Sequence, residues 1–184
     1  MDRYALWGRH GIAVYGANAS VVGYNTITGN ALSGIFAKSS GVQIGDGGFG
    51  LPIGAPGEGP KYANMITGNN TAGTTDNGGI YAYIGASLDI RYATISGNKG
   101  DGVILKLRST ARMYGNTIND NSSNGILLVQ GGGLRLQGIP ENVPPVTATG
   151  NGSGFALQCG FGEDSYLGVF AGGSQPVSGS CTWF

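Results

Sequence analysis

The chain has 184 residues, ten basic and ten acidic side chains and a formal net charge of zero, so nothing in its charge favours a nucleic-acid partner. Its length suffices for one domain with a substantial core, and no apolar run approaches the roughly 18 residues needed to insert across a membrane. Glycine is abundant at 37 residues, while two cysteines allow one disulfide and no metal cage, so we expect neither a cofactor nor a metal site.

Residues 1–10, MDRYALWGRH, precede any regular pattern and lack the apolar core of a signal peptide. We interpret this segment as the N-terminal edge of a repetitive fold or as a truncated coil. The only histidine, His10, ends the segment, and we expect its side chain to lie exposed at a turn. A single histidine at such a place does not suggest a serine–histidine–aspartate triad.

A repeat begins after this segment, with a glycine followed by an apolar residue at the start of each copy. Copies without insertions are 23 residues apart. Longer copies predict insertions at 45–63, 70–78 and 137–145 within a repeat region at 11–153, and residues 154–184 read as a C-terminal coil or cap. The opening glycines are Gly11, Gly34, Gly79, Gly102, Gly125 and Gly154.

Each copy contains three short runs in which every second residue is apolar, a pattern typical of strands with one buried face. The first run of the first copy places Ile12 and Val14 inward, the second run Ser20 and Val22, and the third run Ile27. One coil of about 23 residues cannot bury its apolar face alone. Successive coils must therefore stack, with each strand pairing in parallel with its equivalent in the next coil.

The third run carries a recurring motif. NTITGN at 25–30 returns as NMITGN at 64–69, ATISGN at 93–98, NTINDN at 116–121 and VTATGN at 146–151. Together with the G-I-x-V openings, this motif resembles the right-handed parallel β-helix repeat family, the pectate-lyase-like solenoid, and particularly its NosD-like variant. The resemblance implies an all-β, right-handed, single-stranded parallel β-helix of about six coils of about 23 residues, with three short strands per coil.

The second copy also resembles glycine-rich coils of large bacterial surface proteins. The resemblance therefore implies a region of a larger secreted or cell-surface protein. Cys159 and Cys181 are 22 residues apart, about one coil, so we expect them to form a disulfide between neighbouring strands, which is compatible with an extracellular location.

The last asparagine of the motif lies at the bend after the third strand. An amide carries two donors and an acceptor, so stacked asparagines can bond to one another and to the turn backbone. This arrangement resembles the asparagine ladder of the family and is structural rather than catalytic. The ladder residues are Asn30, Asn69, Asn98, Asn121 and Asn151.

Enzymatic activity is an alternative, since the resembling fold hosts polysaccharide lyases and glycoside hydrolases. A lyase of this type needs clustered carboxylates for calcium, and here the acidic residues are scattered. Asp89 faces outward, and we expect a surface ion pair with Arg112, with Arg91 close by. Hydrolysis needs paired carboxylates, and the family signatures for it are absent. We assign no catalytic residue and lean against an enzyme.

The outward positions of the first run are apolar and aromatic, interspersed with lysines, and such patches usually contact another molecule. Aromatic rings stack on sugar faces, and lysines suit acidic glycans. We therefore predict contact with a polysaccharide or cell-surface glycan; coverage by insertions, or stacking or lateral self-association with a neighbouring chain, is the alternative. The predicted binding residues are Tyr15, Phe36, Lys38, Tyr81, Tyr83 and Lys106.

The outward positions of the third run form a T-x-T array, which resembles the flat face of β-solenoid ice-binding proteins. Met65 and Asn119 interrupt it, and threonine is also simply favoured on exposed strands. Ice binding is a third hypothesis, after surface or glycan contact and a carbohydrate-active enzyme.

Overall fold

The structure, a computed structural model, describes residues 9–45, 63–136, 145–160, 164–168, 170, 172–178 and 181–183. Within these ranges the regular structure is entirely β, with no helix. Residues 1–8 of the N-terminal edge and most of the insertions at 45–63 and 137–145 lie outside the described residues, as do parts of the C-terminal coil. The insertion at 70–78 is described throughout.

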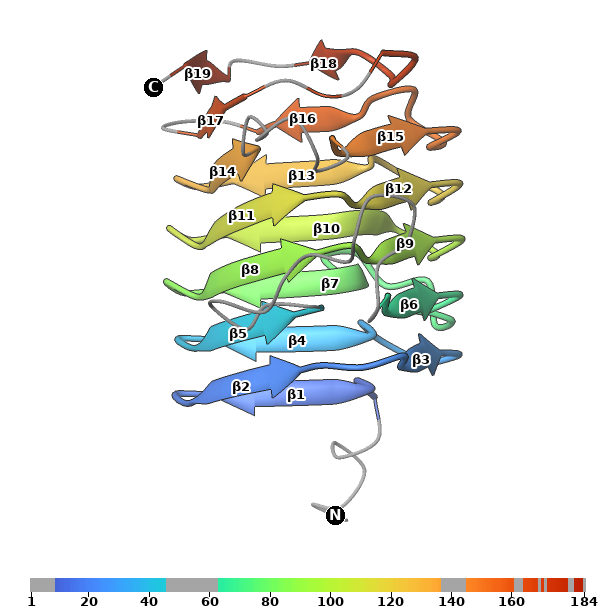
Figure 1. The fold of residues 1–184 in the computed structure, drawn as a ribbon, viewed down its shortest axis with the longest axis vertical. Coiled ribbons are helices and arrows are strands. Elements are labelled where there is room, and N and C mark those ends of the chain that lie inside the picture. Colours follow the sequence, from blue (N-terminus) through green and yellow to red (C-terminus); the bar gives the residue numbers. More distant parts are fainter. Residues whose placement is uncertain are drawn as a thin grey trace, which may run out of the picture.

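The chain winds through three parallel sheets in turn and forms a right-handed parallel β-helix, as the repeat predicts (Figure 1). The first sheet contains β1 (Ile12–Tyr15), β4 (Ile35–Lys38), β7 (Gly78–Tyr83), β10 (Asp101–Lys106), β13 (Ile126–Val129), β16 (Leu157–Cys159) and β18 (Val177–Ser178). The second sheet contains β2 (Asn18–Val21), β5 (Gly41–Ile44), β8 (Ser87–Arg91), β11 (Thr110–Tyr114), β14 (Gly133–Leu136), β17 (Ser165–Leu167) and β19 (Thr182–Trp183). The third sheet contains β3 (Thr26–Thr28), β6 (Met65–Thr67), β9 (Thr94–Ser96), β12 (Thr117–Asn119) and β15 (Thr147–Thr149).

The core is a set of columns in which like side chains stack from coil to coil. In the first sheet Ile12 pairs with Ile35, and Ile35 with Ile80. In the third sheet Ile66 pairs with Ile95. Strands of neighbouring coils lie about 4.8 Å apart, so each inward side chain contacts its equivalents above and below. This stacking makes the residues of one column neighbours, although they are far apart in the sequence.

The prediction that Ser20 and Val22 of the first strand in the second sheet, β2, face inward was wrong by one residue. Ala19 pairs with Val42 and Val21 with Ile44, so Ala19 and Val21 face the core in place of Ser20 and Val22. Val21 is 7% exposed, whereas Val22, which follows the strand, is 50% exposed. A shift of one residue moves every side chain of a strand to the opposite face, and the observed register stacks Ala19 on Val42 and leaves the polar Ser20 outside.

The glycine that opens each of the first five copies is required by the asparagine motif. A Cβ atom added to Gly79 would lie 2.8 Å from Asn98 Nδ2 and 2.7 Å from Ile95 Cγ2. A side chain at this position would therefore displace the asparagine amide. The glycine and the asparagine, 19 residues apart in the sequence, are two halves of one packing arrangement.

Candidate functional site

The expected asparagine ladder is present along the bend between the third and first sheets. Asn30 Nδ2 donates to Asn69 Oδ1 at 2.7 Å, and Asn69 Nδ2 donates to Asn98 Oδ1 at 3.0 Å. Asn98 and Asn121, both 1% exposed, continue the series at 2.8 Å, and Asn121 donates to Asn151 Oδ1 at 3.0 Å. The ladder ends on Gln175, whose Oε1 accepts from Asn151 Nδ2 at 2.9 Å, an end residue that the motif did not indicate.

The interior ladder amides have no capacity left for a ligand. Asn121 Nδ2 also donates to Ile95 O, and Asn121 Oδ1 accepts from both the backbone N–H and the side chain of Asn98. With both hydrogens and the oxygen bonded inside the protein, these residues stabilise the bend.

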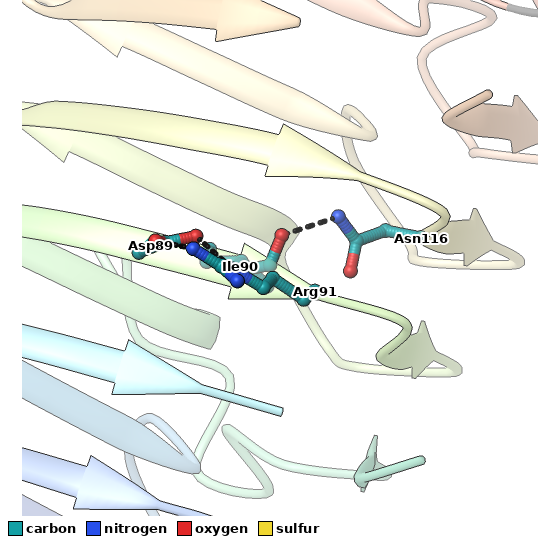
Figure 2. A network of polar contacts seen from close by, with 4 residues as sticks. All are labelled: Asp89, Ile90, Arg91 and Asn116. Carbon is teal, nitrogen blue, oxygen red and sulfur yellow. Dashed lines mark hydrogen bonds and ion pairs between the residues drawn. The ribbon is translucent and has the colours of Figure 1, made fainter. Parts of the chain in front are cut away.

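A second, shorter asparagine column precedes the third sheet, and the sequence analysis did not identify it. Asn25 Nδ2 donates to Asn64 Oδ1 at 2.8 Å, and Asn64 Nδ2 donates to Val21 O. Asn116 Nδ2 donates to Ile90 O at 2.9 Å (Figure 2). The signal was the first asparagine of the same motif, which is present in the copies at 25–30, 64–69 and 116–121.

The disulfide between Cys159 and Cys181 is present, with the two Cα atoms 5.3 Å apart. It lies in the C-terminal part of the helix, where Leu157 of β16 pairs with Val177 of β18. The cross-link therefore ties the last described coil to the one before it.

The aromatic outer face of the first sheet is less exposed than the alternation suggested. Tyr15 is 57% exposed, but Phe36 and Tyr81 are each only 9% exposed, which corrects the expectation that all the rings meet solvent. Side chains of the same face cover one another. Phe36 lies 5.4 Å, centroid to centroid, from the rings of both Tyr15 and Tyr81, and Ile104 packs into the same cluster.

A ring outside the strands completes this cluster. His10 stacks on Phe36 with ring centroids 4.7 Å apart and 21° between the planes. It is half-buried rather than exposed at a turn as expected, because Ala13, the partner of Phe36 on β1, is too small to cover the phenyl ring. Burial lowers the pKa of His10 below its ordinary value of 6.5.

The next outward row of the first sheet alternates tyrosine and lysine. Tyr15 pairs with Lys38, and Lys38 with Tyr83, on three successive strands. The Lys38 ammonium lies 5.9 Å from the centroid of the Tyr83 ring, within range of a cation–π interaction. Lys106, one strand further on, forms an ion pair with Asp76 of the 70–78 insertion at 2.8 Å.

The two lysines therefore differ in character. The charge of Lys106 is balanced by Asp76, while Lys38 has no carboxylate partner within the described part of the chain. Burial is also the main reason that the pKa of Tyr81 is raised, with a further contribution from the Asp76 carboxylate. The Tyr81 hydroxyl therefore stays protonated, and no carboxylate of the described residues balances the positive charge of Lys38.

A shallow groove of about 420 Å³ lies on the second sheet, over β2, β5 and β8. Asp89 is in its lining and is paired with Arg91 on its own strand, through Arg91 Nε to Asp89 Oδ1 at 2.8 Å and a second contact at 2.5 Å (Figure 2). Residues two apart on a strand lie on the same face, which places Arg91 beside Asp89. Arg112, the expected partner, stands opposite Asp89 on β11. Arg91 in turn lies over the Tyr114 ring, 4.8 Å from its centroid.

The T-x-T array of the third sheet is in register across all its strands. One row reads Thr26, Met65, Thr94, Thr117 and Thr147, and the other reads Thr28, Thr67, Ser96, Asn119 and Thr149. Met65 and Asn119 interrupt the rows at the positions that the sequence indicated.

Carboxylates are not gathered into a cluster on any of these faces. No group of three or more histidine, cysteine or acidic side chains is placed to hold a metal within the described ranges. Asp101, at the start of β10, is buried and accepts from the backbone N–H and the side chain of Asn124. Burial raises the pKa of Asp101, and these hydrogen bonds oppose the shift.

Comparison with known proteins gives one match. A family model described as "Right handed beta helix region" matches residues 5–138. No curated protein and no solved structure matches the chain. The described segments contain no helix that could span a membrane.

Proposed function

The chain belongs to the right-handed β-helix family, and from that premise we propose that it is a non-catalytic carbohydrate-binding module of a larger secreted or cell-surface protein. The disulfide between Cys159 and Cys181 is compatible with an extracellular place. The fold itself serves many functions, so the proposal rests on one surface, the tyrosine–lysine row of the first sheet.

The observation that carries the proposal is the position of Lys38 between Tyr15 and Tyr83 on adjacent strands. The two tyrosines are separated by two strand spacings, about 10 Å, so sugar units along one chain can reach both rings while passing over the lysine. The rings cover apolar sugar faces, and the ammonium pairs with a carboxylate. This combination favours an acidic glycan that contains uronate units.

Phe36 and Tyr81 have a supporting role in this proposal. Because they are buried, they do not serve as platforms, but their edges hold Tyr15 and Tyr83 in place. Tyr81 lies 5.6 Å from Tyr83, and Phe36 lies 5.4 Å from Tyr15. A ring held by neighbours loses less freedom on binding, which increases affinity.

The proposal is tested by the retention of the protein in gels that contain polygalacturonate. A Tyr15→Ala/Tyr83→Ala variant and a Lys38→Gln variant should each lose most of the retardation while keeping the parent melting temperature. The matched control is Tyr24→Ala, which removes a tyrosine that is 72% exposed and lies outside the first sheet. Equal retardation of all four proteins would reject the tyrosine–lysine row as the binding surface.

Turnover is measured in the same experiment. With polygalacturonate, with and without added Ca²⁺, we expect no formation of unsaturated uronate and no new reducing ends. Either product would support the alternative of a carbohydrate-active enzyme, a polysaccharide lyase or a glycoside hydrolase.

The register of the third sheet favours ice binding as a second candidate function. Its two outward rows present hydroxyl and methyl groups at a regular interval of about 4.8 Å along the helix. An ice-binding protein lowers the freezing point without lowering the melting point. If the parent protein separates the freezing point from the melting point, Thr117→Tyr, in the middle of one row, should abolish that difference. A parent protein that shows no difference between the two temperatures excludes this function.

A further inference from the structure

We propose that the groove on the second sheet is a separate binding site for an uncharged polyhydroxylated ligand, such as a neutral oligosaccharide. The site lies over β2, β5 and β8, on a different sheet from the tyrosine–lysine row, and does not depend on it. Shape, hydrogen-bonding capacity and charge each support this assignment.

The shape follows from the register. Asn18, Gly41 and Ser87 form one outward row, and Ser20, Gln43 and Asp89 form the next. Gly41 and Ser87 of the first row have small side chains or none, whereas Gln43 and Asp89 of the second row have longer ones. The surface is therefore hollowed along the first row. A Cβ atom on Gly41 would lie 2.6 Å from Asn18 Oδ1, so glycine is needed for Asn18 to keep its place at the groove.

The lining has a high and unused capacity for hydrogen bonds. Asn18, Ser20, Gln43 and Ser87 supply two amides and two hydroxyls, and the described residues offer their side chains no hydrogen-bond partner. Amides and hydroxyls both donate and accept, as sugar hydroxyls do. The contrast with the ladder amides, which are fully bonded inside the protein, identifies these four as the amides and hydroxyls of the groove that are open to a ligand.

The charge of the groove excludes a preference for acidic ligands. Its only ionised lining residue is Asp89, and Arg91 balances this charge through two contacts (Figure 2). The stacking of Arg91 on Tyr114 holds the arginine in the position that orients the carboxylate. Asp89 therefore presents fixed acceptor oxygens without a net charge, which suits the paired hydroxyls of a neutral sugar.

The test is a titration of the isotope-labelled protein with neutral hexasaccharides of β-1,4-linked glucose, mannose and xylose, followed by amide chemical shifts. We expect at least one of them to give saturable shifts that centre on β2, β5 and β8. Gln43→Ala and Asp89→Asn should each weaken that binding about fivefold or more. The first removes an amide from the groove, and the second exchanges one acceptor oxygen for a donor and breaks the two-point contact with Arg91. Ser87→Tyr, which fills the groove, should abolish binding.

Two controls separate the outcomes. Arg135→Ala changes an exposed side chain in the same outward row as Asp89, two strands away, and should bind like the parent. Tyr15→Ala/Tyr83→Ala should also bind neutral hexasaccharides like the parent, so failure of the first-sheet proposal does not affect this one. The groove proposal is overturned if no hexasaccharide gives shifts over these strands, or if Ser87→Tyr binds as tightly as the parent.

Discussion

His10 stacks on Phe36, with their ring centroids 4.7 Å apart, and so links the segment before β1 to the outer face of the first sheet. Through Phe36 it also reaches Tyr15, a residue of the proposed glycan surface, and Tyr81, which supports that surface from below. A titratable ring therefore packs beneath that surface, and its protonation should change the stability of the folded protein with pH.

The stability of the protein should rise with pH across the titration of His10. Burial lowers the pKa of His10 in the folded state, so below about pH 6.5 the unfolded chain binds the proton more readily than the folded one. Acid therefore destabilises the fold through this group, and the effect disappears above pH 6.5, where both states are neutral. Melting curves between pH 5 and 7.5 should show a smaller dependence for His10→Phe, which keeps the ring, and an unchanged dependence would contradict the assignment.

Replacing Asp101 by asparagine should maintain or raise stability at pH 7. Burial raises the pKa of Asp101, so its charge opposes folding at neutral pH, whereas an asparagine still accepts from Asn124 without a charge. Protonation relieves the same cost in the parent, so any advantage of Asp101→Asn should shrink as the pH falls from 7 to 4. Denaturant unfolding at both pH values measures the difference, and a clear loss at pH 7 would show that the charge itself is needed.

Removal of one interior ladder amide should destabilise the protein. Asn121→Ala leaves the Ile95 carbonyl and the Asn98 amide without their partners, which should cost about 1–3 kcal/mol in unfolding free energy. Asn30→Ala, at the half-buried beginning of the ladder, should cost less, because water can replace its bonds. Equal effects of the two substitutions in urea titrations would argue against burial as the origin of the cost.

The register of β2 is tested by two adjacent valines. Val21→Ala should lower the unfolding free energy by about 2 kcal/mol, because it removes buried methyl groups. Val22→Ala, at a side chain that is 50% exposed, should change it by less than about 0.5 kcal/mol. The opposite order would restore the inward assignment of Ser20 and Val22.

Reduction of the Cys159–Cys181 bond should lower stability while the rest of the helix stays folded. A cross-link that closes a loop of this size contributes about 3 kcal/mol, mainly by restricting the unfolded chain. The comparison is between the parent protein with and without a reductant, with Cys159→Ser/Cys181→Ser as the control that the reductant should not affect. Parent curves that coincide under both conditions would contradict a stabilising role.

The fold could be predicted from the sequence because one constraint repeats in every coil. Gly79 and Asn98, or Gly102 and Asn121, occupy one packing position together, so the motif and its spacing specify the solenoid directly. The exposure of Phe36 and Tyr81 could not be predicted in this way. It depends on which side chains stand on neighbouring strands and on His10, which lies outside the repeat. The groove was missed for a similar reason, since it results from small residues meeting across three strands.

The side-chain hydrogen bonds of the ladder also share one orientation along the helix axis. Each amide from Asn30 to Asn151 donates one N–H to the side-chain oxygen of the next ladder residue toward the C-terminal end. The second N–H of Asn69, Asn98, Asn121 and Asn151 donates to a backbone carbonyl of the preceding coil. Aligned amide dipoles add and polarise one another, as peptide dipoles do along an α-helix. The side-chain bonds of the ladder therefore run in one direction along the axis on which the coils stack (Figure 1).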